Sequence, residues 1–111
     1  PLMMRNKRGS IINFSTIAVN IALEGESIYI ASKSGIEGFS RAFAREVSDF
    51  NINVNCILPG TINTPQNSID MPNADFSNWV PTTDLANEIL HLCSEQAKGV
   101  TGAAIMVQGK S

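Results

Sequence analysis

The strongest constraint on the fold is the order in which strand-like and helical segments alternate along the chain. Apolar, strand-like runs occupy Ser10–Ser15, Asn53–Leu58 and a stretch within Val100–Gln108. Between them, apolar residues recur every three or four positions from Ile28 to about Phe50 and from Thr83 to Gln96, which is the helical period. Strands separated by helices pair in parallel through right-handed crossovers. The sequence therefore predicts an α/β fold with a parallel sheet of about three strands.

The connecting segments differ in length and in composition. Thr16–Ser27 has a loop-like composition, and Ser27 is a candidate N-cap for the helix that follows. The second strand stops at the breaker pair Pro59-Gly60. Thr61–Pro81 is too long for a routine connection, and long segments of this kind are usually lids or binding loops.

The predicted set of elements covers a parallel sheet poorly. Such sheets normally carry helices on both faces, and two helices are few for this purpose. The chain also opens with Pro1 and an apolar Leu-Met-Met run, which reads as the middle of a helix. We therefore expect these residues to be one piece of a larger domain.

Charge and cysteine content exclude several classes of function. Eight basic and ten acidic residues give a net charge of -2, which argues against nucleic acid or an anionic membrane as the partner. No apolar run approaches the length of a transmembrane helix. Cys56 and Cys93 lack metal-ligand spacing and are expected to be buried free thiols in a reducing compartment. No metal site and a cytoplasmic location are predicted.

Tyr29 and Lys33 are the first candidates for chemistry. They stand four positions apart at the start of the long helix, so they share one face. An ammonium group one turn away favours the ionised phenolate, and the pair could then exchange a proton with a substrate oxygen. The same spacing also fits an ordinary surface tyrosine beside a surface lysine.

The ends of the two strands change that balance. Ser15 and Thr16 end the first strand, and Pro59-Gly60 ends the second. Ligands of open α/β sheets bind at the carboxyl edge of the strands, where all of these residues meet. If the pleat of the first strand continues, Ser15 and Thr16 point to opposite faces. A hydroxyl pair, a Tyr/Lys pair and a Pro-Gly turn therefore converge on one predicted site.

The order of these motifs resembles a known family. The run GSIINFST…YIASKSGIEGFSRAFAREV…INVNCILPGTINT resembles the C-terminal half of a short-chain dehydrogenase/reductase, and the resemblance extends over essentially the whole chain. It implies a partial Rossmann-like, doubly wound parallel sheet. Residues 1–111 would then be the C-terminal half of a single NAD(P)-binding domain whose upstream nucleotide-binding half is absent.

The resemblance also implies roles for individual residues. In the family, a hydroxyl residue thirteen positions before the tyrosine polarises the substrate carbonyl, and that position is Thr16, where serine is usual. Tyr29 would act as acid or base, and Lys33 would hold the nicotinamide ribose. The cofactor-binding residues that it implies after the second strand are Pro59, Gly60, Ile62 and Thr64. A turn without a Cβ at Gly60 would let the backbone approach the nicotinamide ring.

The implied activity is reduction of a carbonyl, or oxidation of an alcohol, with NAD or NADP. The implied partners are a small-molecule substrate and a second copy of the chain, in a homodimer or homotetramer formed through the Tyr/Lys helix. The stretch TPQNSIDMPNADFSNWVP resembles that of dihydropteridine reductase, which makes such an activity an alternative. In this stretch the larger apolar residues would either contact the substrate or anchor the loop, namely Met71, Phe76 and Trp79.

One family element is missing. Dinucleotide binding relies on a glycine-rich turn between a strand and a helix, and no strand here is followed by one. Gly35 and Gly38 lie instead within the tyrosine helix. These residues alone are therefore expected to be inactive. Either they belong to a full reductase, or they act as a non-catalytic assembly module.

Overall fold

The computed structural model describes residues 1–111, and its elements follow the predicted alternation. The strands are β1 (Gly9–Phe14), β2 (Ile52–Pro59) and β3 (Ala104–Val107). The α-helices are α1 (Leu2–Asn6), α2 (Ala18–Ile21), α3 (Ser27–Glu46), α4 (Pro65–Asp70) and α5 (Thr82–Leu92). Short 3-10 helices are η1 (Ser48–Phe50), η2 (Phe76–Asn78) and η3 (Glu95–Ala97).

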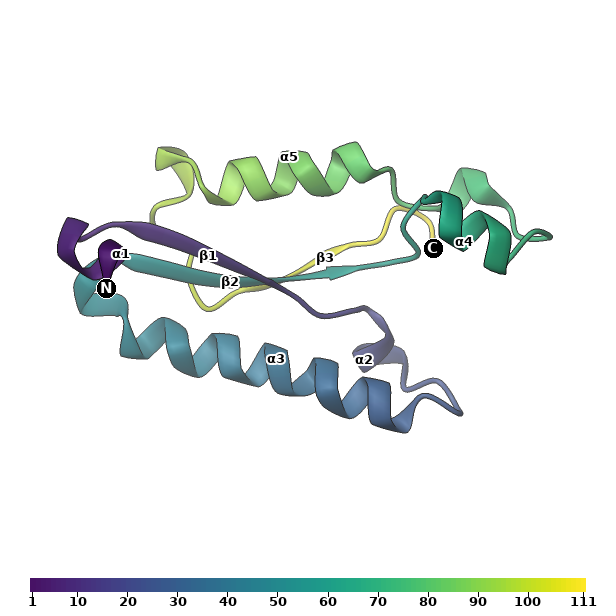
Figure 1. The fold of residues 1–111 in the computed structure, drawn as a ribbon, viewed down its shortest axis with the longest axis horizontal. Coiled ribbons are helices and arrows are strands. Elements are labelled where there is room, and N and C mark those ends of the chain that lie inside the picture. Colours follow the sequence, from purple (N-terminus) through teal and green to yellow (C-terminus); the bar gives the residue numbers. More distant parts are fainter.

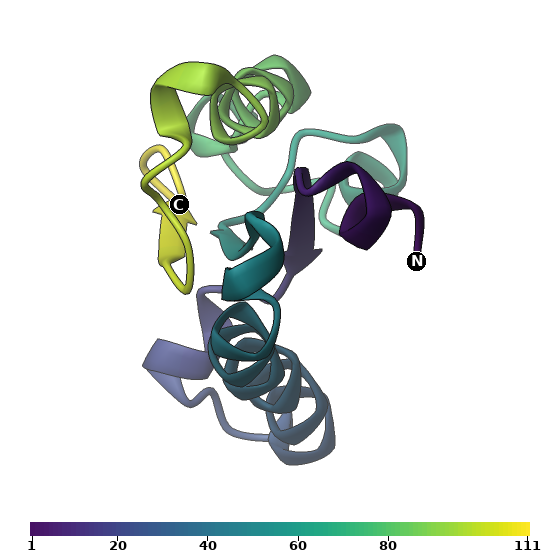
Figure 2. The ribbon, with the colours of Figure 1, turned by 90° about the vertical axis from the view of Figure 1, so that its left-hand side faces the viewer.

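The three strands form one sheet in the order β1-β2-β3, and both pairs are parallel. Figure 1 shows α3 on one face of this sheet and α5 on the other. The perpendicular view in Figure 2 shows the same three layers, with the sheet between the two helices. The predicted α/β class with a three-stranded parallel sheet is therefore confirmed, as a partial Rossmann-like fold.

The core forms on the two faces of β2. Since successive strand residues point to opposite faces, β2 supplies side chains to both layers. The layer under α3 contains a cluster of four buried residues, Ala44, Val47, Ile52 and Val54. The layer under α5 contains a second cluster, Ile57, Val80, Leu85 and Leu92. β2 is therefore buried almost throughout, as near-continuous apolar strands of parallel sheets are.

Helix α3 begins and ends earlier than its apolar period predicts. Its N-cap is Glu26 and not Ser27, because the first helical hydrogen bond runs from the Ile30 N–H to the Glu26 carbonyl at 2.8 Å. The helix ends at Glu46, and the predicted last turn is the 3-10 helix η1. Asn51 then adopts a left-handed φ of 55°, a conformation that asparagine tolerates, and the chain turns into β2.

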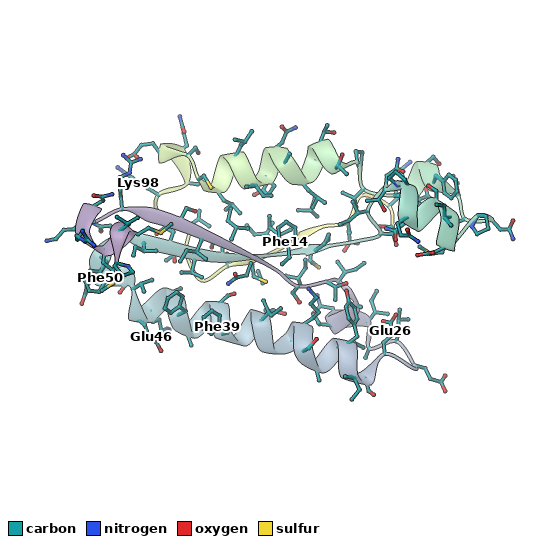
Figure 3. All side chains as sticks on the ribbon, in the orientation of Figure 1. Phe14, Glu26, Phe39, Glu46, Phe50 and Lys98 are labelled. Atoms are coloured by element: carbon teal, nitrogen blue, oxygen red, sulfur yellow. The ribbon has the colours of Figure 1, made fainter.

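The predicted apolar stripe of α3 divides between core and surface. Val47 is buried, and Phe43 and Phe50 pack against the cluster under α3. Phe39 is 56% exposed and stacks on Phe43 with ring centroids 5.1 Å apart. Figure 3 shows Phe39 on α3 between Glu26, at the start of the helix, and Phe50 beyond its end. Only the second half of the predicted stripe therefore packs in the core.

Two predicted loops contain short helices. The segment expected as loop after β1 includes α2, and the long segment before α5 includes α4 and η2. Local contacts explain where α4 begins, because the Thr64 hydroxyl caps the helix by accepting a hydrogen bond from the Asn67 N–H at 3.2 Å. Pro65 occupies the first helical position, where its missing N–H costs nothing. α5 ends at Leu92, four residues before the predicted end at Gln96.

The two free cysteines differ in environment. Cys56 is buried on β2, and burial, followed by the nearby Glu37 carboxylate, raises the pKa of its thiol. Cys93 is exposed, so the expectation that both thiols are buried is wrong. It directly follows α5, where only part of the helix surface faces the sheet. No helix combines the length and the apolar character needed to span a bilayer.

Asn55 joins β2 to the loop before β3. The residue is 0% exposed, yet its amide nitrogen donates to the Val100 carbonyl at 2.9 Å. Its amide oxygen accepts from the Ala103 N–H at 3.1 Å. One buried side chain thus forms hydrogen bonds with two backbone groups of the segment that precedes β3. These bonds also satisfy the side chain itself, since buried polar groups need hydrogen-bond partners.

Replacing Asn55 should therefore destabilise the fold. We expect Asn55→Ala to lower the free energy of unfolding by about 2–4 kcal/mol, since two backbone groups lose a partner. Asn53→Ala is the matched control, because Asn53 lies on the same strand, is only half-buried and makes a single bond, to the Lys98 carbonyl at 2.9 Å. Urea unfolding of both variants checks this. Equal losses would contradict it.

Candidate active site

The carboxyl ends of the strands, α2, α4 and the start of α3 gather at one end of the molecule, as Figure 1 shows. Backbone hydrogen bonds continue the β1–β2 pairing beyond β1 itself. The Ser15 N–H donates to the Ile57 carbonyl at 2.8 Å, and the Ile17 N–H donates to the Pro59 carbonyl at 3.2 Å. Thr16 therefore lies beside Pro59 at the carboxyl edge of the sheet.

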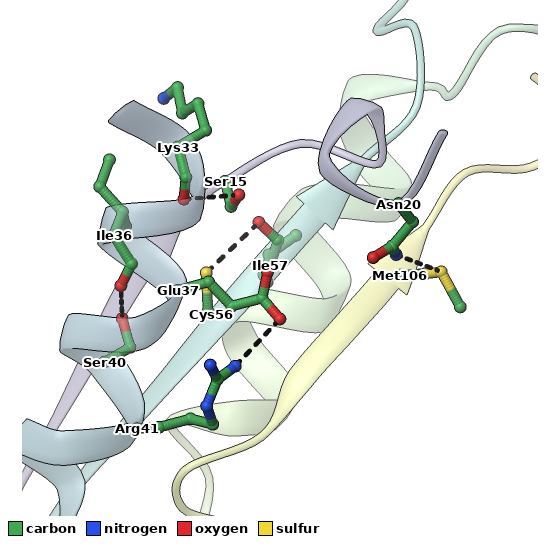
Figure 4. A network of polar contacts seen from close by, with 10 residues as sticks. All are labelled: Ser15, Asn20, Lys33, Ile36, Glu37, Ser40, Arg41, Cys56, Ile57 and Met106. Atoms are coloured by element: carbon green, nitrogen blue, oxygen red, sulfur yellow. Dashed lines mark hydrogen bonds and ion pairs between the residues drawn. The ribbon is translucent and has the colours of Figure 1, made fainter. Parts of the chain in front are cut away.

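Lys33 is held at this same strand end by two hydrogen bonds. The Ser15 hydroxyl donates to the Lys33 carbonyl at 3.0 Å, a contact drawn in Figure 4. The Lys33 ammonium in turn donates to the Phe14 carbonyl at 3.3 Å. The structure thus brings Lys33 to the strand residues immediately before Thr16. Two of the three predicted catalytic residues share one location.

Tyr29 lies one turn before Lys33, in the first turn of α3. The side chain is 47% exposed, and its phenol makes no hydrogen bond within the chain. The Tyr29 carbonyl accepts from the Ser32 hydroxyl at 3.0 Å, which involves the backbone only. The phenol is therefore free to meet a ligand at the edge occupied by Lys33.

The Thr16 hydroxyl has one partner within the chain. Its oxygen accepts from the Ala18 N–H at 3.2 Å, a local contact that starts α2. A hydroxyl carries one donor and two acceptor sites, so the Thr16 proton remains available. The residue is half-buried, and its free donor is compatible with a bond to a substrate oxygen.

The turn after β2 packs closely against the segment that follows β3. The Gly60 N–H donates to the Val107 carbonyl at 3.0 Å. A Cβ on Gly60 would lie 3.1 Å from both the Cα and the carbonyl oxygen of Gln108, and would collide with the Ser111 hydroxyl. The close approach that requires glycine here is therefore made by the chain itself. The expected approach of a nicotinamide ring is not needed to explain Gly60.

Ile62 and Thr64 offer hydrogen-bonding groups beyond this turn. Ile62 pairs with Val80 in an isolated bridge, and its carbonyl accepts from the Asn67 side chain at 2.7 Å. Its N–H finds no acceptor within the chain. The Thr64 oxygen caps α4, which leaves the hydroxyl proton free. These free donors, with the Lys33 ammonium, fit the amide and hydroxyl acceptors of a nicotinamide riboside.

The three large apolar residues singled out in the long segment differ in how much of each is exposed. Trp79 is 7% exposed, and its ring lies 4.6 Å from that of Phe76 between centroids. Its burial makes it an anchor of the segment. Of the three predicted residues, Met71 and Phe76 remain exposed and stay available to a substrate.

Sequence reasoning missed a set of polar contacts beneath α3. The Asn13 amide donates to the Ser40 hydroxyl at 2.9 Å, and Ser40 donates to the Ile36 carbonyl at 2.8 Å. Ser15 makes the third contact, to Lys33, and all these residues are drawn in Figure 4 except Asn13. A signal existed, because Asn13 and Ser15 alternate within an apolar strand and buried polar groups need partners.

The three-stranded parallel sheet with helices on both faces defines a partial Rossmann-like fold, and comparison with known protein families agrees. The family model described as enoyl-(acyl carrier protein) reductase matches residues 1–109. The chain belongs to the short-chain dehydrogenase/reductase family, as its motifs predicted.

Two curated proteins are similar to nearly the whole of this chain. Nodulation protein G of Rhizobium meliloti (strain 1021) is 36% identical over 115 residues, covering 96% of this chain and 47% of that protein. The 3-oxoacyl-[acyl-carrier-protein] reductase FabG of Staphylococcus aureus (strain Mu50 / ATCC 700699) is 33% identical over 120 residues, covering 98% and 48%. The chain thus spans about half the length of the curated relatives it matches.

Solved structures agree with this assignment. A short-chain type dehydrogenase/reductase from Mycobacterium ulcerans superposes with a TM-score of 0.89 at 28% identity, covering 97% of this chain and 43% of that one. The acetoin dehydrogenase from Enterobacter cloacae has a TM-score of 0.81 at 30% identity, covering 96% and 45%. The three-stranded sheet and its helices therefore correspond to part of larger enzyme folds.

The packing around Gly60 predicts a stability effect at the edge of the site. We expect Gly60→Ala to lower the free energy of unfolding by about 1–3 kcal/mol, because the added methyl overpacks the Gln108–Ser111 segment. Gly99→Ala is the control, since a Cβ there meets nothing within 4 Å. Thermal unfolding of both variants measures the difference, and an unchanged Gly60→Ala protein would show that the segment moves freely.

Proposed function

We propose that these residues belong to a reductase that transfers a hydride between NAD(P) and a carbonyl or alcohol, with Tyr29 as acid and base. The observation that carries this proposal is the location of Lys33. Its two hydrogen bonds to Phe14 and Ser15 hold it beside Thr16, while Tyr29 presents a free phenol one turn away. A proton donor, a cation and a hydroxyl donor thus gather at one sheet edge.

We further propose that residues 1–111 form the C-terminal half of a single Rossmann-like domain. The shape supports this, since the radius of gyration is 15.5 Å, where a compact domain of this length has about 13 Å. β1 supports it too. Although apolar, this edge strand contains no fully buried residue. The nucleotide-binding half would cover it, and these residues alone would be inactive.

Each residue has a defined part in the proposed reaction. A bound reduced nicotinamide would supply a hydride to the carbonyl carbon. The Thr16 hydroxyl donates a hydrogen bond to the carbonyl oxygen, where negative charge develops. Tyr29 gives its proton to that oxygen, which completes the alcohol, and regains a proton from solvent. Lys33 binds the ribose hydroxyls and holds a positive charge near the phenol.

The turn after β2 would bind the nicotinamide end of the cofactor. The Ile62 N–H and the Thr64 hydroxyl would hold the carboxamide, because both donors lack a partner in the chain. Pro59 and Gly60 would act by shaping the turn. The Pro59 carbonyl is already engaged by the Ile17 N–H. The choice between NAD and NADP depends on residues outside this chain.

The names of the relatives supply several candidate substrate classes. The Staphylococcus aureus relative is named a 3-oxoacyl-[acyl-carrier-protein] reductase, and a structural neighbour is named an acetoin dehydrogenase. A pteridine substrate, suggested by the segment from Thr64 to Pro81, stays an alternative. A non-catalytic assembly module is the alternative in a different class. A cytoplasmic location also stays a prediction.

The tyrosine role is tested on the complete natural polypeptide with NADH and NADPH. Acetoacetyl-coenzyme A, diacetyl and a quinonoid dihydropterin represent the three substrate classes. We expect Tyr29→Phe to lower turnover by about 10²–10⁴-fold, because general acid catalysis is lost, with little change in NAD(P)H binding. Loss of the reduced nicotinamide's absorbance gives turnover, and calorimetry gives binding.

Ser32→Ala is the matched control for this test. Its hydroxyl contacts only the Tyr29 carbonyl in the same exposed turn, so its removal should leave turnover unchanged. An equal loss of nicotinamide binding in Tyr29→Phe would show that the phenol binds and does not transfer a proton. A complete wild-type polypeptide that neither binds nor oxidises NAD(P)H would favour the assembly module.

The exposed side of α3 supports association with a second copy of the chain. Five small or apolar residues spaced by three and four positions lie on this side and are all exposed, Ile28, Ala31, Gly35, Phe39 and Ala42. A Cβ added at Gly35 would meet nothing within 4 Å. A contiguous apolar helix side without a partner is typical of an interface.

A charge on this side should therefore block association without unfolding the chain. We expect Gly35→Arg to shift the complete protein to a smaller oligomer, because the side chain would place a buried cation in the contact. Ser34→Arg, at a neighbouring exposed position of α3, is the control. Light scattering after size-exclusion chromatography measures the mass. Unchanged mass for Gly35→Arg would place the interface elsewhere.

A further inference from the structure

Ser15 occupies a buried position between the sheet and the start of α3. The residue is only 3% exposed, although it follows the last residue of β1. Its N–H is fixed to β2 by the bond to the Ile57 carbonyl at 2.8 Å. Its hydroxyl donates to the Lys33 carbonyl at 3.0 Å (Figure 4). One residue thus connects the central strand to the helix.

The contact with Lys33 is reciprocal. Ser15 holds the Lys33 backbone, while the Lys33 ammonium donates to the carbonyl of Phe14 at 3.3 Å. The Lys33 carbonyl also lies inside α3, where it can accept the regular helical bond and keeps a second lone pair for the Ser15 hydroxyl. Both ends of the lysine, its peptide group and its ammonium, are therefore held by consecutive residues of one strand end.

We propose that Ser15 is a positioning residue that sets the place of Lys33 and Tyr29 relative to Thr16. This inference rests on the proposed function of those three residues. Thr16 follows Ser15 directly, so the bond to Lys33 links the hydroxyl donor to the Tyr/Lys helix through one residue. Without it, α3 would still pack on the sheet through its apolar second half, but its first two turns would keep only the exposed Lys33 ammonium bond to the Phe14 carbonyl as a polar contact with this strand end.

Ser40 offers an internal comparison. Its hydroxyl is also buried between α3 and β1, at 1% exposure, and it makes two hydrogen bonds where the Ser15 hydroxyl makes one. Its partners are Asn13 on β1 and the Ile36 carbonyl of its own helix, and neither belongs to the site. Ser15→Ala and Ser40→Ala therefore each remove a buried hydroxyl from the contact of α3 with β1 and its end, and only the Ser15 hydroxyl contacts Lys33.

The test uses the complete polypeptide carrying Ser15→Ala, Ser15→Cys or Ser40→Ala. In Ser15→Ala we expect the Kd for NADPH or NADH to rise and kcat per folded molecule to fall, each by about 3- to 10-fold, as loss of one hydrogen bond predicts. Ser15→Cys, with a similar volume and a weaker donor, should fall between. Ser40→Ala should leave both within about twofold, since lost folding reduces active molecules without changing Kd.

A second readout does not depend on activity. Amide hydrogen exchange in the first two turns of α3 should become faster in Ser15→Ala than in Ser40→Ala, because that end of the helix is less held. Equal Kd, kcat and exchange in the two alanine variants would overturn the role of Ser15 while leaving the proposed function intact. If the wild-type polypeptide neither binds nor oxidises NADPH or NADH, both proposals fall together.

Discussion

The architecture depends on the hydrogen bonding of β2 along both of its edges. Parallel pairing with β1 and with β3, continued by the residues that flank these strands, satisfies its backbone along both edges and directs its side chains to two apolar layers. α3 and α5 must then lie on opposite faces to cover those layers. Since both neighbours run in the same direction, the segments that follow all three strands emerge at one end. The candidate site is a consequence of this arrangement.

Two of the buried polar residues connect neighbouring elements. Asn55 joins β2 to the segment before β3, and Ser15 joins the end of β1 to α3. Each is satisfied by backbone groups at the far side, so neither leaves a buried donor or acceptor unmatched. The Ser15 contact also holds Lys33 at the strand end next to Thr16. One hydrogen bond thus contributes both to the packing of α3 and to the geometry of the candidate site.

Sequence reasoning was accurate for long periodic elements and weaker at their ends. The strands, the helix carrying Tyr29 and the parallel sheet followed from periodicity, because burial on one face or on both leaves a regular pattern. The short helix α4 depends on a single capping contact, made by the Thr64 hydroxyl, while α2 and the start of α3 have no side-chain cap. Such contacts involve one residue each, and periodicity does not register them.

By itself, the sequence determined the element order and the family, and it predicted that Thr16, Tyr29 and Lys33 meet at one sheet edge, because strand ends and helical spacing are local properties. Only the tertiary structure decided that Ser15 faces Lys33 and that Trp79 is an anchor. It likewise decided that Gly60 makes room for the end of the chain. These contacts join residues far apart in the sequence, and their side-chain directions depend on how the layers pack.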